Sequence, residues 1–416
     1  MKLMSRLMIL VVIMCMLVSC YIPALAQDIE TQSSAALLID VDSTSVLYEK
    51  NADEKMAPAS TTKIMTLLIV AEKVNMSDSV TVDSSMIASI PSDATIAYFQ
   101  HGEVTTVETL FMASYLMSAN DAAHILASHI GGSIDGFAQM MNERAKELGC
   151  KNTHFVNPTG LYNSEHYTTA NDMAIIAKAF YSNETVKKYI TRQEFTIPSS
   201  PMRPDPFPIS NTNALMKKED MHYYPSVVFG KTGYTDGSKF TIVSIARKDN
   251  RTLMAVAFSA EGKSDMYNDA KKLFDYGFGN FYSLTITKTE LENLFSGKRR
   301  EFISVKNDVK LTIPSNVPRD SIRKSVESID SEAYLTVKGN GYDYSLKVAD
   351  VQKKKGASSF FAGIFGFIWW LIVTILKFIL WLVLIVVVLY IILAIYVNTI
   401  KKRRRQRNKR MKNSPK

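Results

Sequence analysis

Cysteine is scarce in this chain, which has three in 416 residues. Two of them, Cys15 and Cys20, lie in an apolar N-terminal stretch, so only Cys150 remains in the part expected to fold. One cysteine cannot form an internal disulfide, and Cys150 is interpreted as a small apolar side chain that follows a predicted helix. The lack of a disulfide indicates that a hydrophobic core stabilises the folded part.

Metal-ligand spacing is absent as well. None of the six histidines stands in an H-x-x-x-H arrangement; they are His101, His124, His129, His154, His166 and His222. A zinc peptidase needs ligands at such spacings. The sequence therefore predicts neither a metal nor any other cofactor.

The folded part also lacks a basic surface. The net charge is +9, but ten lysines and arginines fall in residues 401–416, and Lys2 and Arg6 precede the first apolar stretch. Residues 27–357 are left with a net negative charge. Nucleic acid is therefore not a predicted partner, since its binding needs a basic patch.

The N-terminus has the form of an export signal. Lys2 and Arg6 precede an apolar run over residues 7–17, and small residues stand at Ala24 and Ala26. This pattern predicts a signal peptide over residues 1–26. A lipoprotein-type cut, which would leave Cys20 as an acylated N-terminus, is an alternative, and both predict export.

The C-terminal end has the form of a membrane anchor. Residues 378–397 are apolar and uncharged, about the length that spans a bilayer as a helix, and a basic tail over residues 398–416 follows. Positive charge after a span predicts a cytoplasmic C-terminus and a catalytic part on the extracytoplasmic face. Residues 352–377 are predicted to be a linker and an interfacial segment, or an extension of a tilted helix in which Lys377 reaches the headgroups.

Residues 27–283 mix strand and helix patterns. A helix over residues 61–74 is apolar on nearly every side and is predicted to be buried. Strands are predicted at 35–48, 227–231, 240–247 and 251–259, and further helices at 107–116, 121–129, 134–148, 170–181 and 269–276. Five prolines predict an irregular surface loop over residues 197–212. This order indicates an α/β (α+β) domain whose sheet is completed by both of its ends.

Residues 284–351 change to short alternating runs. They predict a small all-β domain with strands at 284–287, 302–305, 309–313, 334–337 and 344–348. Asn340 between two glycines predicts the turn of a hairpin. Ser321 and Lys324 form an S-x-x-K pattern here, which is interpreted as a solvated surface run.

A second S-x-x-K pattern has a different setting. Ser60 and Lys63 lie at the start of the predicted buried helix, nearly one turn apart, so that hydroxyl and amine share a face. A lysine kept dry in this position has a lowered pKa and can act as a general base for serine. Ser60 alone could equally be the N-cap that begins the helix.

Two further motifs follow in the chain. Ser118 and Asn120 lie in a break between predicted helices, where side chains can face a cleft or cap a helix. Lys231, Thr232 and Gly233 lie on a predicted strand, and the glycine would let a substrate backbone approach closely. Each motif is weak by itself, but their order and settings make chance improbable.

The three motifs together resemble the active-site triplet of penicillin-binding proteins and serine β-lactamases. The flanking residues are similar to low-molecular-weight penicillin-binding proteins, the D-alanyl-D-alanine carboxypeptidases of serine peptidase family S11. The flanks are P-A-S-T-T-K-I-M-T at 58–66, S-A-N-D-A-A at 118–123, H-F-V-N-P-T-G-L at 154–161 and K-T-G-Y-T-D at 231–236. The likeness covers about residues 30–350 and implies a penicillin-binding, β-lactamase-like transpeptidase domain, a small all-β domain and a C-terminal transmembrane helix.

The resemblance also implies roles. Ser60 would attack the bond between two D-alanines, Lys63 would be its base, and Ser118 and Asn120 would relay a proton and hold the peptide. Peptidoglycan stem peptides are then the substrate, and β-lactam antibiotics the covalent inhibitors.

The resemblance further implies a substrate-binding group of Lys231, Thr232, Gly233 and Tyr234. Lys231 and Thr232 would bind the terminal carboxylate of the peptide. The backbone N–H groups of Ser60 and Tyr234 would form the oxyanion hole.

The chain departs from the family pattern in one place. Gly237, Ser238 and Lys239 stand where many relatives have a small Ala-Gly pair, and the family's further cation for the carboxylate has no sure counterpart. Lys263 and Arg247 are both candidates. Substrate preference is the property that this departure leaves open.

Other functions of the same motifs stay open to different degrees. A class A β-lactamase is disfavoured because the E-x-x-L-N type loop is missing from residues 157–172. A D,D-endopeptidase that cuts peptide cross-links is compatible with the same motifs. A penicillin-binding receptor without turnover is the alternative from another class, and the intact serine and lysine pattern disfavours it.

Overall fold

The computed structural model describes residues 29–298, 300–353 and 357–412 of the chain. The predicted signal peptide, with Cys15, Cys20 and the cut after Ala26, lies outside these residues. The chain divides into two compact units. The first takes the chain up to Thr287 together with Asp308–Ile322 and Gly339–Tyr342; the second takes Lys288–Asn307, Arg323–Lys338 and Asp343–Lys416.

The first unit contains an antiparallel five-stranded sheet in the order β2-β1-β9-β8-β7. Its strands are β1 (Ala35–Asp40), β2 (Val46–Lys50), β7 (Val227–Thr235), β8 (Lys239–Lys248) and β9 (Arg251–Ala260). The prediction that both ends of the domain complete one sheet is therefore confirmed. The single strand predicted over residues 35–48 is wrong, because the chain turns after β1 and pairs back on it, with Thr44 at a φ of 61°.

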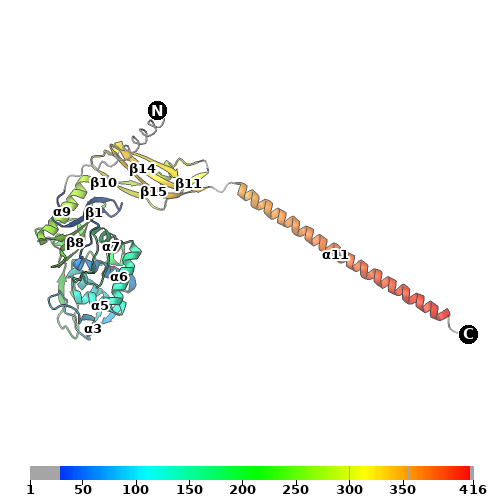
Figure 1. Ribbon diagram of the computed structural model, residues 1–416, viewed down its shortest axis with the longest axis horizontal. Helices are drawn as coiled ribbons and strands as arrows, with labels where there is room; N and C mark the ends of the chain where they lie inside the picture. The colour runs from blue at the N-terminus through cyan, green and yellow to red at the C-terminus, as the bar shows by residue number, and fades with distance from the viewer. Residues whose placement is uncertain (1–28, 299, 354–356, 413–416) are drawn as a thin grey trace, which may run out of the picture. The chain divides into compact units, whose positions relative to one another are not determined.

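Helices cover both faces of this sheet (Figure 1). One face packs against α7 (Ala170–Ser182) and shares its hydrophobic core with α2 (Lys63–Lys73), α4 (Val107–Leu116), α5 (Asn120–Gly131) and α6 (Ile134–Leu148). The other face packs against α9 (Lys263–Asn280), which is longer than predicted. The predicted burial of the helix after Ser60 is confirmed, because eight successive residues from Lys63 to Val70 are buried in α2.

Shorter elements complete the first unit. They are the 3-10 turns η1 (Ala59–Thr62), η2 (Ala214–Met216) and η3 (Arg319–Ser321), the helices α3 (Ser84–Ile87) and α8 (Glu184–Lys187), and the strand pairs β3 (Ser79–Thr81) with β4 (Val104–Thr106) and β10 (Phe281–Ile286) with β12 (Val309–Pro314). The strand β12 follows closely the run predicted at residues 309–313.

The irregular loop predicted over residues 197–212 is wrong at Ile197 and over residues 207–210, which form strands. The strands β5 (Glu194–Ile197) and β6 (Phe207–Ser210) pair antiparallel, so residues 198–206 and 211–212 are the irregular part. Pro208 lies within β6 opposite Thr196. A two-stranded hairpin tolerates this proline because the missing N–H can lie on the unpaired edge.

The second unit contains the four-stranded sheet β11-β15-β14-β13 and the helix α10 (Lys288–Leu294). Its strands are β11 (Glu301–Ile303), β13 (Arg323–Ile329), β14 (Glu332–Gly339) and β15 (Tyr342–Lys353). Lys324 of the second S-x-x-K pattern lies on β13, where its ammonium pairs with Glu290 of α10 at 2.5 Å.

The helix α11 (Ala357–Lys412) is the last element. Its stretch Phe367–Arg403 is long and apolar enough to cross a membrane, with a mean hydropathy of 3.4 in its most apolar part. The predicted span, residues 378–397, lies inside this stretch. Residues 357–377 continue the same helix, which agrees with the alternative of an extended helix.

Candidate active site

Ser60 lies in the tight turn η1, directly before α2. The preceding residue, Ala59, takes a φ of 45°, which a residue with a side chain adopts only when its surroundings hold it there. The backbone beside Ala59 is fixed at the carbonyl of Pro58, which accepts hydrogen bonds from the hydroxyls of Thr61 at 2.6 Å and Thr241 at 3.1 Å. The turn therefore presents Ser60 at the N-terminal end of a buried helix.

Lys63 lies beneath Ser60 and is completely buried. Its Nζ donates to Ser60 Oγ at 3.0 Å, to Asn120 Oδ1 at 2.9 Å and to the carbonyl of Thr159 at 2.9 Å. Burial, and then the charge of Lys231, lowers the pKa of Lys63 well below its ordinary value, while Asp121 opposes them. A neutral amine in contact with a serine hydroxyl can accept its proton.

The S-x-N motif lies beside this pair. Ser118 takes a φ of 63°, and Asn120 begins α5. Both N–H donors of Asn120, the backbone N and Nδ2, bond to the carbonyl of Thr95 at 2.8 and 2.9 Å. The side-chain oxygen is thereby directed at Lys63.

The third motif lies on β7. The Lys231 ammonium donates to Ser118 Oγ at 3.0 Å and to the carbonyl of Thr232 at 3.0 Å. Burial lowers the pKa of Lys231 to about 7. The three motifs are thus brought together in one place by hydrogen bonds, although Ser118 and Lys231 are 113 residues apart.

These side chains border a cleft of about 970 Å³ in the first unit. Of the eight predicted site residues, six line it: Ser60, Ser118, Asn120, Thr232, Gly233 and Tyr234. Lys63 and Lys231 lie buried behind the lining. Lys263 also lines the cleft, whereas Arg247 lies at the exposed end of β8 and is not among the lining residues.

Several contributors to the site were not predicted individually. Thr95 and Thr159 act through backbone carbonyls, which carry no side-chain signal in a sequence. Tyr162 also lines the cleft, and its ring lies against Gly237. His124 is buried one turn after Asn120, where burial and the charge of Lys63 lower its pKa to about 4, so its imidazole is neutral.

Cys150 lies outside this site. It is half-buried, and its thiol donates to the carbonyl of Asp172 at 3.7 Å. Burial raises the pKa of the thiol to about 12, which makes it a poor nucleophile.

Gly233 is required by the closeness of β7 to Ser60. A Cβ at this position would lie 2.6 Å from the backbone nitrogen of Ser60 and 2.8 Å from Ala59 Cβ. We expect Gly233→Ala to lower the rate of acylation by penicillin about 100-fold, because it displaces the serine by a fraction of an ångström or more. The control is Gly279→Ala, whose Cβ would meet nothing within 4 Å. Wild-type acylation by Gly233→Ala would contradict this expectation.

An α+β domain with a serine, a buried lysine, an S-x-N motif and a K-T-G strand around one cleft defines an active-site serine enzyme of the penicillin-binding class. The family model of the D-alanyl-D-alanine carboxypeptidases, peptidase S11, matches residues 23–262. This chain belongs to that family.

Individual relatives agree with this assignment. The chain is 33% identical over 327 residues to the D-alanyl-D-alanine carboxypeptidase DacF of Bacillus subtilis, which covers 75% of this chain and 80% of the relative. It is 31% identical to DacC of Escherichia coli, over 64% of this chain and 67% of the relative. Penicillin binding protein 5 from Haemophilus influenzae has a similar fold, with a TM-score of 0.67 at 23% identity over 79% of this chain and 99% of that one. The predicted family and fold class are confirmed.

Proposed function

We propose that this chain is a serine D-alanyl-D-alanine carboxypeptidase, which removes the terminal D-alanine of peptidoglycan pentapeptides through an acyl-enzyme on Ser60. The observation that carries the proposal is the position of the Lys63 amine, buried and within 3.0 Å of both Ser60 Oγ and Asn120 Oδ1. The relatives named as D-alanyl-D-alanine carboxypeptidases support the substrate class.

Acylation follows from this geometry. The neutral Lys63 amine takes the Ser60 proton as Oγ attacks the carbonyl between the last two D-alanines. The C–N bond then breaks, and the proton passes to the departing amine of D-alanine with Ser118 as the relay. Asn120 holds Lys63 and the peptide in place. Water afterwards hydrolyses the ester on Ser60 and regenerates the enzyme.

The oxyanion formed during attack needs two N–H donors. We assign them to the backbone of Ser60 and Tyr234, because β7 passes against the Ser60 turn at Gly233. Charge stabilisation of this kind is commonly the largest single contribution of such a site. A β-lactam acylates the same serine, and its slow hydrolysis would leave the enzyme trapped.

Lys231 is the proposed partner of the terminal carboxylate, together with Thr232. We expect Lys231→Ala to lower kcat/KM for a pentapeptide about 100-fold, since a buried charge pair would be lost. Its pKa of about 7 gives the sign of the pH dependence: above that pH the free ammonium loses its charge, so kcat/KM should fall. Kinetics of D-alanine release between pH 5 and 9, for the wild type and for Lys231→Ala, check the loss in the variant and the fall in kcat/KM at high pH. Unchanged kcat/KM in the variant would remove Lys231 from carboxylate binding.

The test of the proposed function is D-alanine release by the full chain in detergent. The substrates are a pentapeptide that ends in two D-alanines and a cross-linked dimer of such peptides, with Ser60→Ala as the control. We expect free D-alanine from the pentapeptide and little cleavage of the dimer. Preferred cleavage of the dimer would show that the protein is a D,D-endopeptidase instead. Penicillin binding without cleavage of either substrate would show that it is a receptor without turnover.

We further propose that α11 anchors the protein in the cell membrane by a single span, with the catalytic part outside and the C-terminus in the cytoplasm. The stretch Phe367–Arg403 is apolar, and lysines and arginines follow the predicted span. Anionic lipid would hold the basic tail. Protease protection of a C-terminal tag in spheroplasts tests this orientation.

A further inference from the structure

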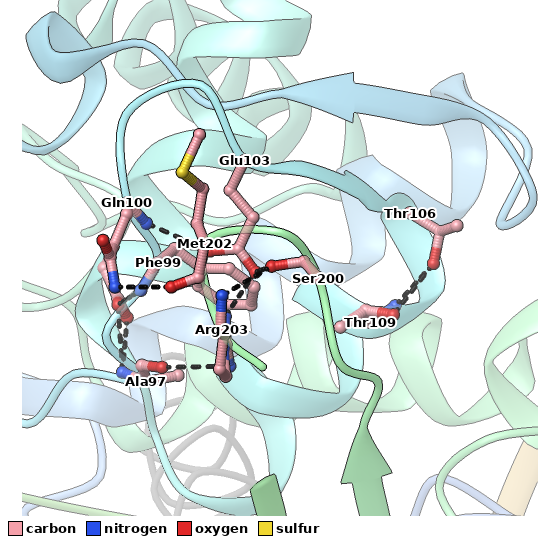
Figure 2. A network of polar contacts seen from close by, with 10 residues as sticks. Ala97, Phe99, Gln100, Glu103, Thr106, Thr109, Ser200, Met202 and Arg203 are labelled. Carbon is pink, nitrogen blue, oxygen red and sulfur yellow. Dashed lines mark hydrogen bonds and ion pairs between the residues drawn. The ribbon is translucent and has the colours of Figure 1, made fainter. Parts of the chain in front are cut away.

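The loop between β5 and β6 is fastened to a distant segment by a network around Arg203 (Figure 2). The Arg203 guanidinium donates to Glu103 Oε1 at 2.6 Å and to the carbonyl of Ala97 at 3.4 Å. It also lies over the ring of Phe99, 4.8 Å from the centroid. One side chain thereby contacts three residues of the 97–103 segment.

This network is more than a surface ion pair. The side chains of Arg203 and Glu103 are only 12% and 2% exposed. Ser200 Oγ adds a bond to Glu103 Oε1 at 3.0 Å, and Gln100 Nε2 donates to the carbonyl of Met202 at 3.2 Å. A buried pair with such support holds its geometry well, whereas exposed pairs contribute little.

The fastened segment leads directly to the catalytic site. The buried carboxylate of Asp121 accepts the backbone N–H groups of Ala97 at 2.9 Å and Phe99 at 3.1 Å. Two residues before Ala97, the carbonyl of Thr95 accepts both N–H donors of Asn120. Thr95 also lines the cleft.

Thr95 decides which way the Asn120 amide is turned. An amide has a donor end and an acceptor end, and only the oxygen can accept a hydrogen bond from Lys63 Nζ. Because Nδ2 is bonded to the Thr95 carbonyl, Oδ1 faces Lys63 at 2.9 Å. If Thr95 moved away, the amide could rotate and Lys63 would lose one of its three partners.

We propose that Arg203 is a positioning residue for the reaction: by fastening the 97–103 segment it keeps the Thr95 carbonyl against Asn120, and Asn120 in turn keeps Lys63 against Ser60. This inference rests on the proposed function, since it concerns the residues assigned to acylation there. It predicts that the influence of Arg203 on the chemistry passes through Asn120.

A double-mutant cycle on the full chain in detergent tests this route, with a fluorescent penicillin as the probe. We expect Arg203→Ala to lower the saturating acylation rate constant about 10-fold, with a smaller change in the dissociation constant of the initial complex. In the Asn120→Ala background the same substitution should change that rate less than 2-fold. Arg203→Lys, which can still reach Glu103, should restore part of the loss.

The matched control is Arg192→Ala. Arg192 pairs with Glu108 at 2.7 Å on the surface and contacts no residue of the 97–103 segment in the bonds described for it. We expect wild-type acylation from this variant. If Arg203→Ala does not fold, Glu103→Gln, which keeps the side-chain shape, takes its place in the cycle with a smaller expected loss.

Two outcomes would overturn the proposal. The first is wild-type acylation by Arg203→Ala, or by Glu103→Gln in its place. The second is that Arg203→Ala lowers the acylation rate constant by the same factor in the wild-type and the Asn120→Ala backgrounds. A general loosening of the structure would produce that result. A wild-type chain that forms no penicillin adduct would instead overturn the proposed function, so the two failures are distinguishable.

Discussion

Replacing Ser60 by alanine is expected to lower D-alanine release from a pentapeptide by about 10⁴-fold or more and to remove the penicillin adduct entirely. The hydroxyl oxygen of Ser60 forms the bond to the peptide carbonyl. It lines the cleft and is hydrogen-bonded to Lys63. Because Ser60 is on a turn held by Pro58 and Thr61, the smaller side chain should leave the fold intact. D-alanine release kinetics and a thermal melt check both expectations.

The second S-x-x-K pattern supplies the matched control for this substitution. Ser321 has the same sequence spacing to a lysine, but its hydroxyl donates to the carbonyl of Pro318 at 2.7 Å in the turn before β13. We expect Ser321→Ala to release D-alanine at the wild-type rate. Activity that survives in Ser60→Ala would show that another residue is the nucleophile.

Lys63 is expected to give the next largest effect. Lys63→Arg keeps a positive charge but cannot lose it near neutral pH, so it cannot take the serine proton. We therefore expect acylation by penicillin to slow about 10³-fold, in the range that a general base contributes. Lys63→Ala should show a similar loss and, in addition, a lower melting temperature from the cavity left beside Asn120 and Thr159.

The pH dependence distinguishes a base from a purely structural lysine. The pKa of Lys63 is lowered, so its neutral form is populated at a lower pH than an ordinary lysine would allow, and acylation should fall as the pH drops through that pKa. The positive charge of Lys231 contributes to this lowering. Lys231→Ala should therefore raise the pKa of Lys63 and move the acid limb to higher pH. An acid limb that does not move, or that persists in Lys63→Arg, would contradict the assignment.

The sequence was most informative where chemistry and local pattern coincide. Ser60 and Lys63 are three residues apart at a helix start, so their contact could be predicted from spacing alone. The apolar run of α2 likewise predicted its burial. The contact between Ser118 and Lys231 spans 113 residues and was not predicted; the family resemblance implied only that the two motifs belong to one active site.

Other features depend on long-range packing that no local pattern specifies. The hairpin β5–β6 contradicted a prediction based on proline content, since pairing between its two strands accommodates Pro208. Arg203 and Glu103 are 100 residues apart, and each alone resembles an ordinary surface charge. Backbone carbonyls such as those of Thr95 and Thr159 are present at every residue, so only the fold shows which ones face Asn120 and Lys63.

Acylation of Ser60 is tested most directly by intact-mass analysis of the full chain in detergent after incubation with benzylpenicillin, followed by peptide mapping. We expect one adduct per chain, with the mass of the opened antibiotic, on the peptide that contains Ser60, and none in Ser60→Ala. No adduct on the wild-type chain, or an adduct on another residue, would contradict the assignment of Ser60 as the acylated nucleophile.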